Sequence, residues 1–256
     1  MRNLRAAISF LTRIPVPVSG EANQAAAVPW FPVVGAFIGL AVGGAMAGLV
    51  HLVPSLVAAA LAVLLGVMVT GAFHEDGLAD VADAFAGGWT PAQRLELLKD
   101  PLHGTYGVAA MCGSIVLRIA CVASLGASPA VAFAAVLAAH TLGRSGAVLL
   151  MATVPPARTD GLGAQAARSL RGAHAVLGLL GGVGIVALAT GWWVGPFVLA
   201  MIVGIGVLGR MAMSKISGIS GDVLGAAEQV VECLVLVVAT GLATRSGLWW
   251  SGRWWR

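Results

Sequence analysis

The sequence predicts an all-α fold: a polytopic transmembrane helical bundle of about seven spans, with short cytoplasmic and interfacial helices. Hydrophobic residues make up 59% of the 256 residues and charged residues only 10%, and the mean hydropathy is +0.92. Soluble domains carry about 25% charged residues, so a water-soluble core cannot accommodate this composition. Apolar stretches long enough to cross a bilayer, about 20 residues each, recur along the chain.

Seven apolar segments are the predicted spans, and they form one integral membrane domain over residues 1–256. Their bounds are 33–50, 56–73, 107–126, 130–150, 175–191, 194–209 and 230–244. The short connections between them lack Lys and Arg, whereas the long connections at 74–106, 154–174 and 210–229 contain both or one of these residues. By the positive-inside rule, the long connections and the N-terminus face the cytoplasm. These features are typical of a multi-pass membrane protein.

The two ends of the chain have their own signals. The start, "MRNLRAAISFLTRIPVP", is expected to form an uncleaved interfacial amphipathic helix that stops before Pro15 and Pro17. The tail, "RSGLWWSGRWWR", carries Arg on the side predicted to be outside. Either one span is miscounted or the tail lies along the interface, where Trp is favoured.

The net charge of +4 does not indicate a nucleic-acid partner. The basic residues stand singly near segment ends, where positive-inside loops explain them. The three cysteines lie in or beside apolar stretches without the spacing of a metal site, so they are expected to be small buried hydrophobes.

Acidic residues gather in "HEDGLADVADAF" (74–85), directly after an apolar run. This segment holds four of the eleven carboxylates in the chain: Glu75, Asp76, Asp80 and Asp83. If the helix of 56–73 continues through it, the three aspartates fall at i, i+4 and i+7, within about 60° on one face. Neighbouring carboxylates would then lie about 5–6 Å apart and repel each other.

A solvated acidic helix end is the simpler interpretation of this segment. However, the residues between the carboxylates are apolar, which indicates a helix that still packs against the protein. A carboxylate stripe on a packed helix is better explained by divalent cations, and oxygen ligands favour Mg²⁺ or Mn²⁺ over zinc. Mg²⁺ commonly binds carboxylates together with substrate phosphates, which indicates phosphoryl chemistry. His74 is a candidate base or ligand, or else a hydrogen-bonded interfacial residue.

A short helix is predicted after this cluster, because Thr90, Pro91 and Gln93 form a capping box with proline at N1. It should end near Asp100, before Pro101. The polar turn that follows holds three candidate phosphate or ion contacts: Lys99, Asp100 and His103. An ordinary surface turn is the alternative.

Two further regions offer charges for a substrate. Arg144 lies four residues after His140 inside a predicted span, so it should face the bundle interior and either pair with an acidic residue or bind a substrate phosphate. The Gly- and Ser-rich stretch "KISGISGDVLGAAEQVVE" contains Lys215, a candidate phosphate contact, and Asp222, a candidate metal ligand or base.

Taken together, these motifs resemble the cobalamin synthase family, the adenosylcobinamide-GDP ribazoletransferases. The resemblance covers "FLTRIPVP" (10–17), "PWFPVVGAFIGL" (29–40), "HEDGLADVADAF" (74–85), "KDPLHGTYG" (99–107) and "KISGISGDVLGAAEQVVE" (215–232), in order over nearly the whole chain. It implies a Mg²⁺-dependent transferase of a substituted phosphate group. Adenosylcobinamide-GDP and α-ribazole, or its 5′-phosphate, would give adenosylcobalamin, or its phosphate, and GMP. The sequence leaves open whether the chain forms a homo-oligomer.

Within that chemistry, each candidate residue receives an expected role. Glu75, Asp76, Asp80 and Asp83 would hold Mg²⁺ on the pyrophosphate, and either Asp83 or His74 would be the base for the ribazole hydroxyl. The expected substrate contacts are Lys99, Asp100, His103, Arg144, Lys215 and Asp222.

Two other functions remain as alternatives. A CDP-alcohol phosphotransferase also uses an Asp-Gly and spaced aspartates, but the Arg which that family places after its Asp-Gly is absent from "EDGLADVAD". A membrane transporter would use the acidic face as an ion relay, which requires carboxylates at mid-membrane depth.

Overall fold

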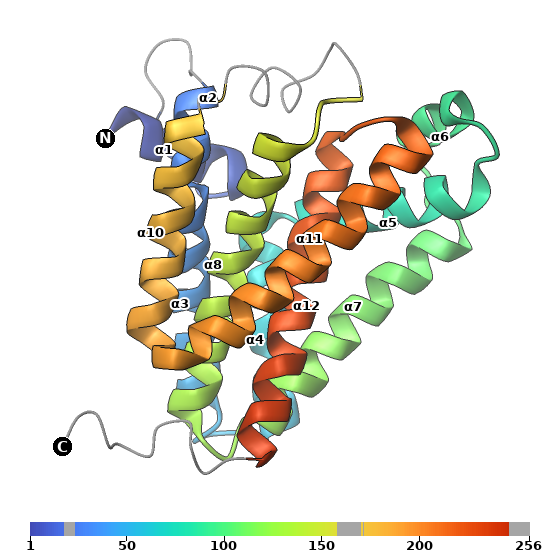
Figure 1. Ribbon diagram of the computed structural model, residues 1–256. Coiled ribbons are helices and arrows are strands. Elements are labelled where there is room, and N and C mark those ends of the chain that lie inside the picture. Colours follow the sequence, from blue (N-terminus) through green and yellow to red (C-terminus); the bar gives the residue numbers. More distant parts are fainter. Residues whose placement is uncertain (18–23, 158–169, 171, 246–256) are drawn as a thin grey trace.

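The computed structural model describes residues 1–17, 24–157, 170 and 172–245 as an all-α chain (Figure 1). The arginines of the predicted cytoplasmic loop at 158–171 and the Trp-rich tail at 246–256 lie outside the described residues. The helices are α1 (Arg2–Leu11), α2 (Gln24–Ala27), η1 (Val28–Trp30), α3 (Phe31–Leu49), α4 (Ser55–Thr70), α5 (Phe73–Gly87), α6 (Pro91–Leu97), α7 (Thr105–Ser124), α8 (Pro129–Thr153), α10 (Gly172–Thr190), η2 (Gly191–Trp193), α11 (Val194–Ile216) and α12 (Gly221–Arg245).

The chain is a polytopic helical membrane protein. Five helical stretches of its described part are long and apolar enough to cross a membrane, and the bent pair α4–α5 could provide a sixth crossing. The sequence predicts about seven spans instead, because the 45-residue stretch Gly172–Ile216 contains two predicted segments. Figure 1 shows these as separate limbs, α10 and α11, which meet at η2. Each of the seven predicted segments therefore coincides with a helix.

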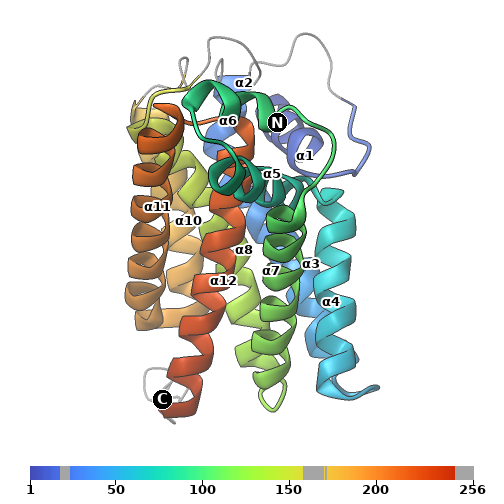
Figure 2. The ribbon, with the colours of Figure 1, turned by 90° about the vertical axis from the view of Figure 1, so that its right-hand side faces the viewer.

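The long helices stand roughly side by side, and α5 and α6 lie across one end of them (Figures 1 and 2). Helix α1 lies at the same end, which we call the α5 end. The connections α3–α4, α7–α8 and α10–α11 lie at the opposite end. This arrangement places the described parts of the predicted long connections on one side and the short connections on the other.

Helix α8 is the centre of the bundle, and 89% of its most apolar 18-residue stretch is buried. It packs most extensively on α3, through glycines that recur every four residues. A Cβ on Gly39 would lie 2.7 Å from the Cα of Leu137, and one on Gly43 would lie 2.9 Å from the carbonyl oxygen of Phe133. Only glycine allows these backbones to approach so closely.

The helix of 56–73 does not continue through the acidic segment, so that prediction is wrong. Gly71 and Ala72 both adopt left-handed conformations, with φ of +68° and +59°. The axes of α4 and α5 consequently differ by 87°. Glycine makes a left-handed residue cheap, whereas Ala72 must be held there by its surroundings. The acidic segment therefore forms a helix of its own, α5, directed across the bundle.

The N-terminal segment stabilises this break. Helix α1 ends at Leu11, and the backbone N–H of Arg13 donates to the carbonyl of Val69, 2.8 Å away, near the end of α4. The ring of Phe10 stacks on Phe31 and meets the edge of Phe73, the first residue of α5. The predicted helix at the start of the chain is thus confirmed, and it packs where α4 turns into α5.

Candidate active site

Three aspartates of α5 lie together on one face, directed towards the connection between α6 and α7. One ring nitrogen of His103, Nε2, lies 3.3 Å from the Oδ1 atom of Asp76, and the other, Nδ1, lies 3.4 Å from the Oδ1 atom of Asp80. Asp83 reaches the same connection one turn further on. We call Asp76, Asp80 and Asp83 the carboxylate face. The imidazole of His103 bridges two of its three members.

Asp83 holds the start of α7 in place. Its Oδ2 atom accepts a hydrogen bond of 2.6 Å from the backbone N–H of Gly104, and its Oδ1 atom accepts one of 2.9 Å from that of Gly107. The first N–H groups of a helix lack partners within it, so a carboxylate there both satisfies them and complements the helix dipole. Asp83 thereby links α5 to the connection that carries His103.

The N-terminus of α12 brings a fourth carboxylate to the same region. Gly77 packs directly on the backbone of Asp222, where a Cβ would lie 2.8 Å from the carbonyl oxygen of Asp222. The Asp222 carboxylate accepts a hydrogen bond of 3.2 Å from the hydroxyl of Ser220, and its charge acts on Asp80. Residues about 140 positions apart in the sequence therefore share one electrostatic environment.

Asp80 is partly buried, and the charges of its neighbours act on its carboxylate. Burial, followed by the charges of Asp76 and Asp222, raises the pKa of Asp80 from 3.8 to about 6, although His103 acts in the opposite direction. Its side chain is 13% exposed, whereas that of Asp76 is 60% exposed. Helix α5 lies across the bundle end, so Asp80 stands outside the spanning segments. A bound cation would stabilise the ionised form of a partly buried carboxylate that lies near other carboxylates.

His74 and Glu75, predicted as a base and a metal ligand, do not lie on the carboxylate face. A helix rotates about 100° per residue, so these two side chains point in other directions from Asp76. Both are buried inside the bundle, at 1% and 2% exposure. The Nε2 atom of His74 lies 2.9 Å from the Oε2 atom of Glu228, and the Oε1 atom of Glu75 accepts a hydrogen bond of 2.7 Å from Arg118.

These two residues belong to a connected set of ionisable side chains in the interior, which we call the buried charge cluster. Its members are His74 and Glu75 of α5, Arg118 of α7, His140 and Arg144 of α8, and Glu228 and Glu232 of α12. Glu232 is its centre, because Arg118, Arg144 and His140 all pair with it. Charged side chains that are buried inside a membrane bundle need partners of opposite charge. The members of this cluster are such partners for one another.

Arg144 illustrates which of the two predicted alternatives the structure supports. Its guanidinium is 1% exposed and pairs with Glu228 at 2.9 Å and with Glu232. The predicted acidic partner of Arg144 is therefore found. Arg118 is not among the site residues predicted from the sequence. It is nevertheless a charged residue inside the apolar span 107–126, and such a residue by itself predicts a buried partner.

The remaining predicted contacts are spread over the α5 end. Lys99 and Asp100 lie on the exposed turn after α6, where the Oδ1 atom of Asp100 accepts a hydrogen bond of 3.0 Å from the backbone of Leu102. The predicted capping box of Thr90 and Gln93 on α6 is confirmed. Lys215 lies on the other side of α5, where its Nζ atom is 3.4 Å from the carbonyl oxygen of Phe85.

The donor set at the carboxylate face fits Mg²⁺ better than a transition metal. Within the described part of the chain, no group of three or more His, Cys, Asp or Glu side chains is arranged so that it could hold a metal ion by itself. Asp76 and Asp80 nevertheless meet at one imidazole, and Asp222 lies near enough to shift the pKa of Asp80. Mg²⁺ typically takes one or two carboxylates and completes its shell with water and substrate phosphates.

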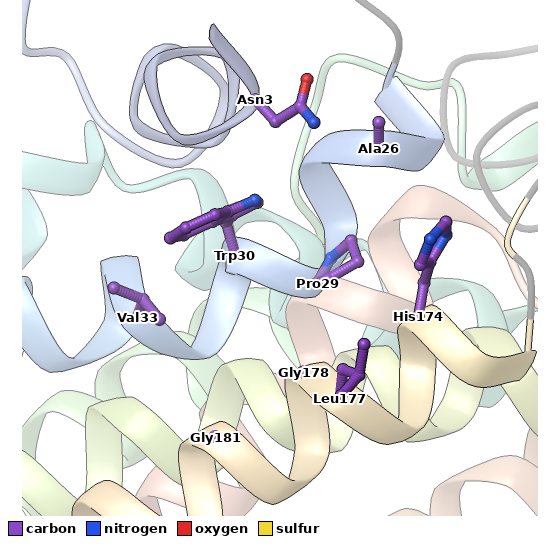
Figure 3. A pocket seen from close by; sticks show the side chains of 9 residues that line it. All are labelled: Asn3, Ala26, Pro29, Trp30, Val33, His174, Leu177, Gly178 and Gly181. Carbon is purple, nitrogen blue, oxygen red and sulfur yellow. The ribbon is translucent and has the colours of Figure 1, made fainter. Parts of the chain in front are cut away.

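A separate hollow of about 360 Å³ lies between α1, η1 and α10 (Figure 3). The side chains of Asn3, Trp30 and His174 stand around it, and Pro29 and Gly178 lie lower in its lining. No carboxylate is among the described residues that line it.

Comparison with known proteins identifies relatives over nearly the whole chain. The family described as cobalamin-5-phosphate synthase matches residues 3–240. An adenosylcobinamide-GDP ribazoletransferase of Azorhizobium caulinodans is 41% identical, over 93% of this chain and 94% of its own length. Proteins of the same name from Bradyrhizobium diazoefficiens and Chlorobaculum tepidum are 42% and 35% identical, and cover 93% and 100% of this chain and 92% and 98% of their own lengths. No solved structure matches.

Proposed function

The chain belongs to the cobalamin-5-phosphate synthase family and has the transferase function of that family, and we propose that its reaction takes place at the carboxylate face of α5. The substrates are adenosylcobinamide-GDP and α-ribazole or its 5′-phosphate. A ribazole hydroxyl attacks the phosphorus nearer the cobinamide, the bond between the two phosphates breaks, and GMP leaves. The corrinoid product is adenosylcobalamin or its phosphate.

The observation that carries this assignment is the convergence of carboxylates at one end of a membrane bundle. Asp76, Asp80 and Asp83 share a face of α5, and Asp222 stands beside them at the start of α12. Burial, together with the charges of Asp76 and Asp222, raises the pKa of Asp80. A diphosphate is itself an anion, so it can approach such a face only when a cation stands between them.

Mg²⁺ is the cation proposed for this position, with Asp76, Asp80 and Asp222 as its ligands. When bound, it supplies positive charge to the phosphate oxygens as the bond between the phosphates breaks. Asp83 acts differently, because both of its oxygens fix the backbone of Gly104 and Gly107. It keeps the connection that carries His103 against α5.

His103 replaces His74 as the proposed proton acceptor for the ribazole hydroxyl. Its imidazole lies on the carboxylate face and is 26% exposed, so an incoming substrate can reach it. His74 is enclosed by Glu228 and Arg144 in the interior. Imidazole is also the side chain whose ordinary pKa suits proton transfer near neutral pH.

The α5 end is proposed to face the cytoplasm of the bacterial inner membrane. Arg94, Lys99 and Lys215 lie at this end, whereas the connections at 50–54, 125–128 and 191–193 contain no Lys or Arg. The positive-inside rule then fixes the orientation. This side also gives the nucleotide substrate direct access from the cell interior.

Release of GMP by the purified full-length protein tests this proposal. Protein in nanodiscs receives adenosylcobinamide-GDP and α-ribazole, with Mg²⁺ or with EDTA, and released nucleotide is separated and quantified. We expect GMP only when Mg²⁺ and both substrates are present. A parallel reaction contains CDP-diacylglycerol with a lipid alcohol acceptor. CMP release in that reaction, with no GMP in the first, would assign the chain to the lipid-forming phosphotransferases instead.

A further inference from the structure

A groove lies beneath α5, on the side opposite to the carboxylate face. It has a volume of about 600 Å³ and lies between α5, α11 and α12. Val81 and Phe85 of α5, Val207 and Met211 of α11, and Leu234 of α12 are among its lining residues. Among the described residues that line it, Lys215 is the one with a charged side chain. We call this the α5–α11–α12 groove.

The two faces of α5 meet different surroundings. At about 100° per residue, Val81 and Phe85 point about 100–180° away from Asp76 and Asp80. Because α5 lies across the bundle end, its carboxylate face points towards α6 and the connections, and its apolar face points towards the spans. A water-borne substrate at the carboxylates therefore does not enter this groove.

The groove instead opens onto the surface that faces the bilayer. Val203, Val207 and Met211 lie along it on α11, a membrane-crossing helix, and they are 52%, 54% and 41% exposed. Apolar side chains that are exposed on a membrane-crossing helix are covered by the hydrocarbon of the bilayer. A lipid chain can thus enter from the side without leaving the apolar phase.

Lys215 gives the groove a direction. It belongs to the last turn of α11, at the α5 end of the bundle. We therefore expect it to lie near the lipid headgroups. Its Nζ atom lies 3.4 Å from the carbonyl oxygen of Phe85, and no acidic side chain pairs with it among the residues that the structure describes. A lysine at the end of a span extends its charge towards the interface, where an anionic phosphate is the complementary group.

We propose that the acyl chain of an anionic phospholipid occupies the α5–α11–α12 groove, with its headgroup phosphate paired to Lys215. The bound chain fills the space beneath Val81 and Phe85, so it supports α5 from the membrane side. The phosphate that Lys215 meets is then that of a lipid rather than that of the nucleotide substrate.

Photolabelling of the full-length protein tests this site. Nanodiscs of phosphatidylcholine contain a small fraction of phosphatidylglycerol with a diazirine in one acyl chain, and labelled peptides are identified by mass spectrometry. A second sample contains the same chain on phosphatidylcholine. Val207→Trp fills the groove, and Leu199→Trp is its control on the exposed surface of α11. Lys215→Gln removes the charge, and Arg210→Gln removes an exposed charge from the same helix.

We expect labelling by phosphatidylglycerol to concentrate on the groove segments of α11 and α12, relative to the exposed surface of α10. Val207→Trp should abolish this excess, and Leu199→Trp should leave it intact. Lys215→Gln should lower the preference for phosphatidylglycerol by about five-fold, which is the contribution of one basic residue at an anionic surface. Even labelling of α10 and α11, or equal effects of the two Trp variants, would overturn the proposal. Displacement of the label by α-ribazole would assign the groove to that substrate.

Discussion

Gly77 of α5 lies directly against the backbone of Asp222, at the start of α12. A Cβ on Gly77 would lie 2.8 Å from the carbonyl oxygen of Asp222 and 3.1 Å from its Cα atom. These neighbours are backbone atoms, so they cannot rotate away as the end of a flexible side chain could. Asp222 can therefore lie this close to the carboxylates of α5 because Gly77 has no side chain.

We expect Gly77→Ala to lower the rate of GMP release while the protein still folds. The added methyl group pushes α12 away from α5, and a displacement on the order of 1 Å costs about 10²-fold in rate when reacting groups are misaligned. Gly44→Ala is the control, because Gly44 has no heavy atom within 4 Å of the position of a Cβ. Both rates are measured on protein that elutes as a single species in detergent. Equal activity of the two variants would show that this contact does not position Asp222.

Asp80→Asn keeps the shape of the side chain and removes its charge. We expect turnover to fall by about 10²-fold or more, the scale on which the loss of one electrostatic group affects a transition-state site. The thermal unfolding temperature should not fall, because the carboxylate of Asp80 is crowded by Asp76 and Asp222. Glu96→Gln, an exposed change on α6, serves as the matched control. Activity within a few-fold of the wild type would remove Asp80 from the proposed metal site.

The raised pKa of Asp80 predicts how stability depends on pH. The folded chain holds this proton up to about pH 6, whereas an ordinary aspartate loses it near pH 3.8. Ionisation between these values therefore favours the unfolded chain, so this contribution to stability is present at low pH and is lost as the pH rises through 6. In EDTA, the wild type should lose more stability than Asp80→Asn between pH 5 and about pH 7.

Thermal unfolding followed by tryptophan fluorescence measures this difference. Added Mg²⁺ should restore the stability of the wild type above pH 6 and should have little effect on Asp80→Asn, because a ligand that binds only the folded state stabilises it. Parallel pH curves for the two proteins, with no effect of Mg²⁺ on either, would contradict the assignment.

Much of the fold could be predicted from the sequence because hydropathy acts locally. All seven predicted spans coincide with helices, and the capping box of Thr90 and Gln93 fixes the start of α6. The break between α4 and α5 could not be predicted in this way. The break depends on the left-handed conformation of Gly71 and on the packing of α1, which is distant in the sequence. Gly66, in the same apolar run, lies within α4.

The candidate site was partly predictable for the same reason. Asp76, Asp80 and Asp83 share a face because helical spacing depends only on nearby residues. The buried partner of Glu75, in contrast, is Arg118, which is 43 residues away in the sequence. Charge pairing across a bundle is a long-range property, so the sequence suggests that Arg118 has a partner without indicating which one.

The pair of Arg118 and Glu75 should behave as a unit in stability measurements. Arg118→Met leaves Glu75 and Glu232 with less compensation in the interior, and breaking a buried pair costs about 3–5 kcal/mol. Removing Glu75 as well, in Glu75→Gln with Arg118→Met, should recover part of this loss, because fewer uncompensated charges remain. Arg210→Met, at an exposed position of the same residue type, is the control. Additive losses in the double variant would show that the two side chains act independently.

The orientation of the bundle can be tested by labelling cysteines at its two ends. Ala79 and Ala84 are both buried completely, so cysteines there would report burial instead of the side of the membrane. Ala92 of α6 is exposed at the α5 end, and Leu52, between α3 and α4, is 79% exposed at the other end. With the three native cysteines replaced, a membrane-impermeant maleimide should label Leu52→Cys in intact spheroplasts and Ala92→Cys in inverted vesicles. The reverse pattern would place the carboxylate face outside the cell, away from the nucleotide pool, and would exclude the proposed orientation.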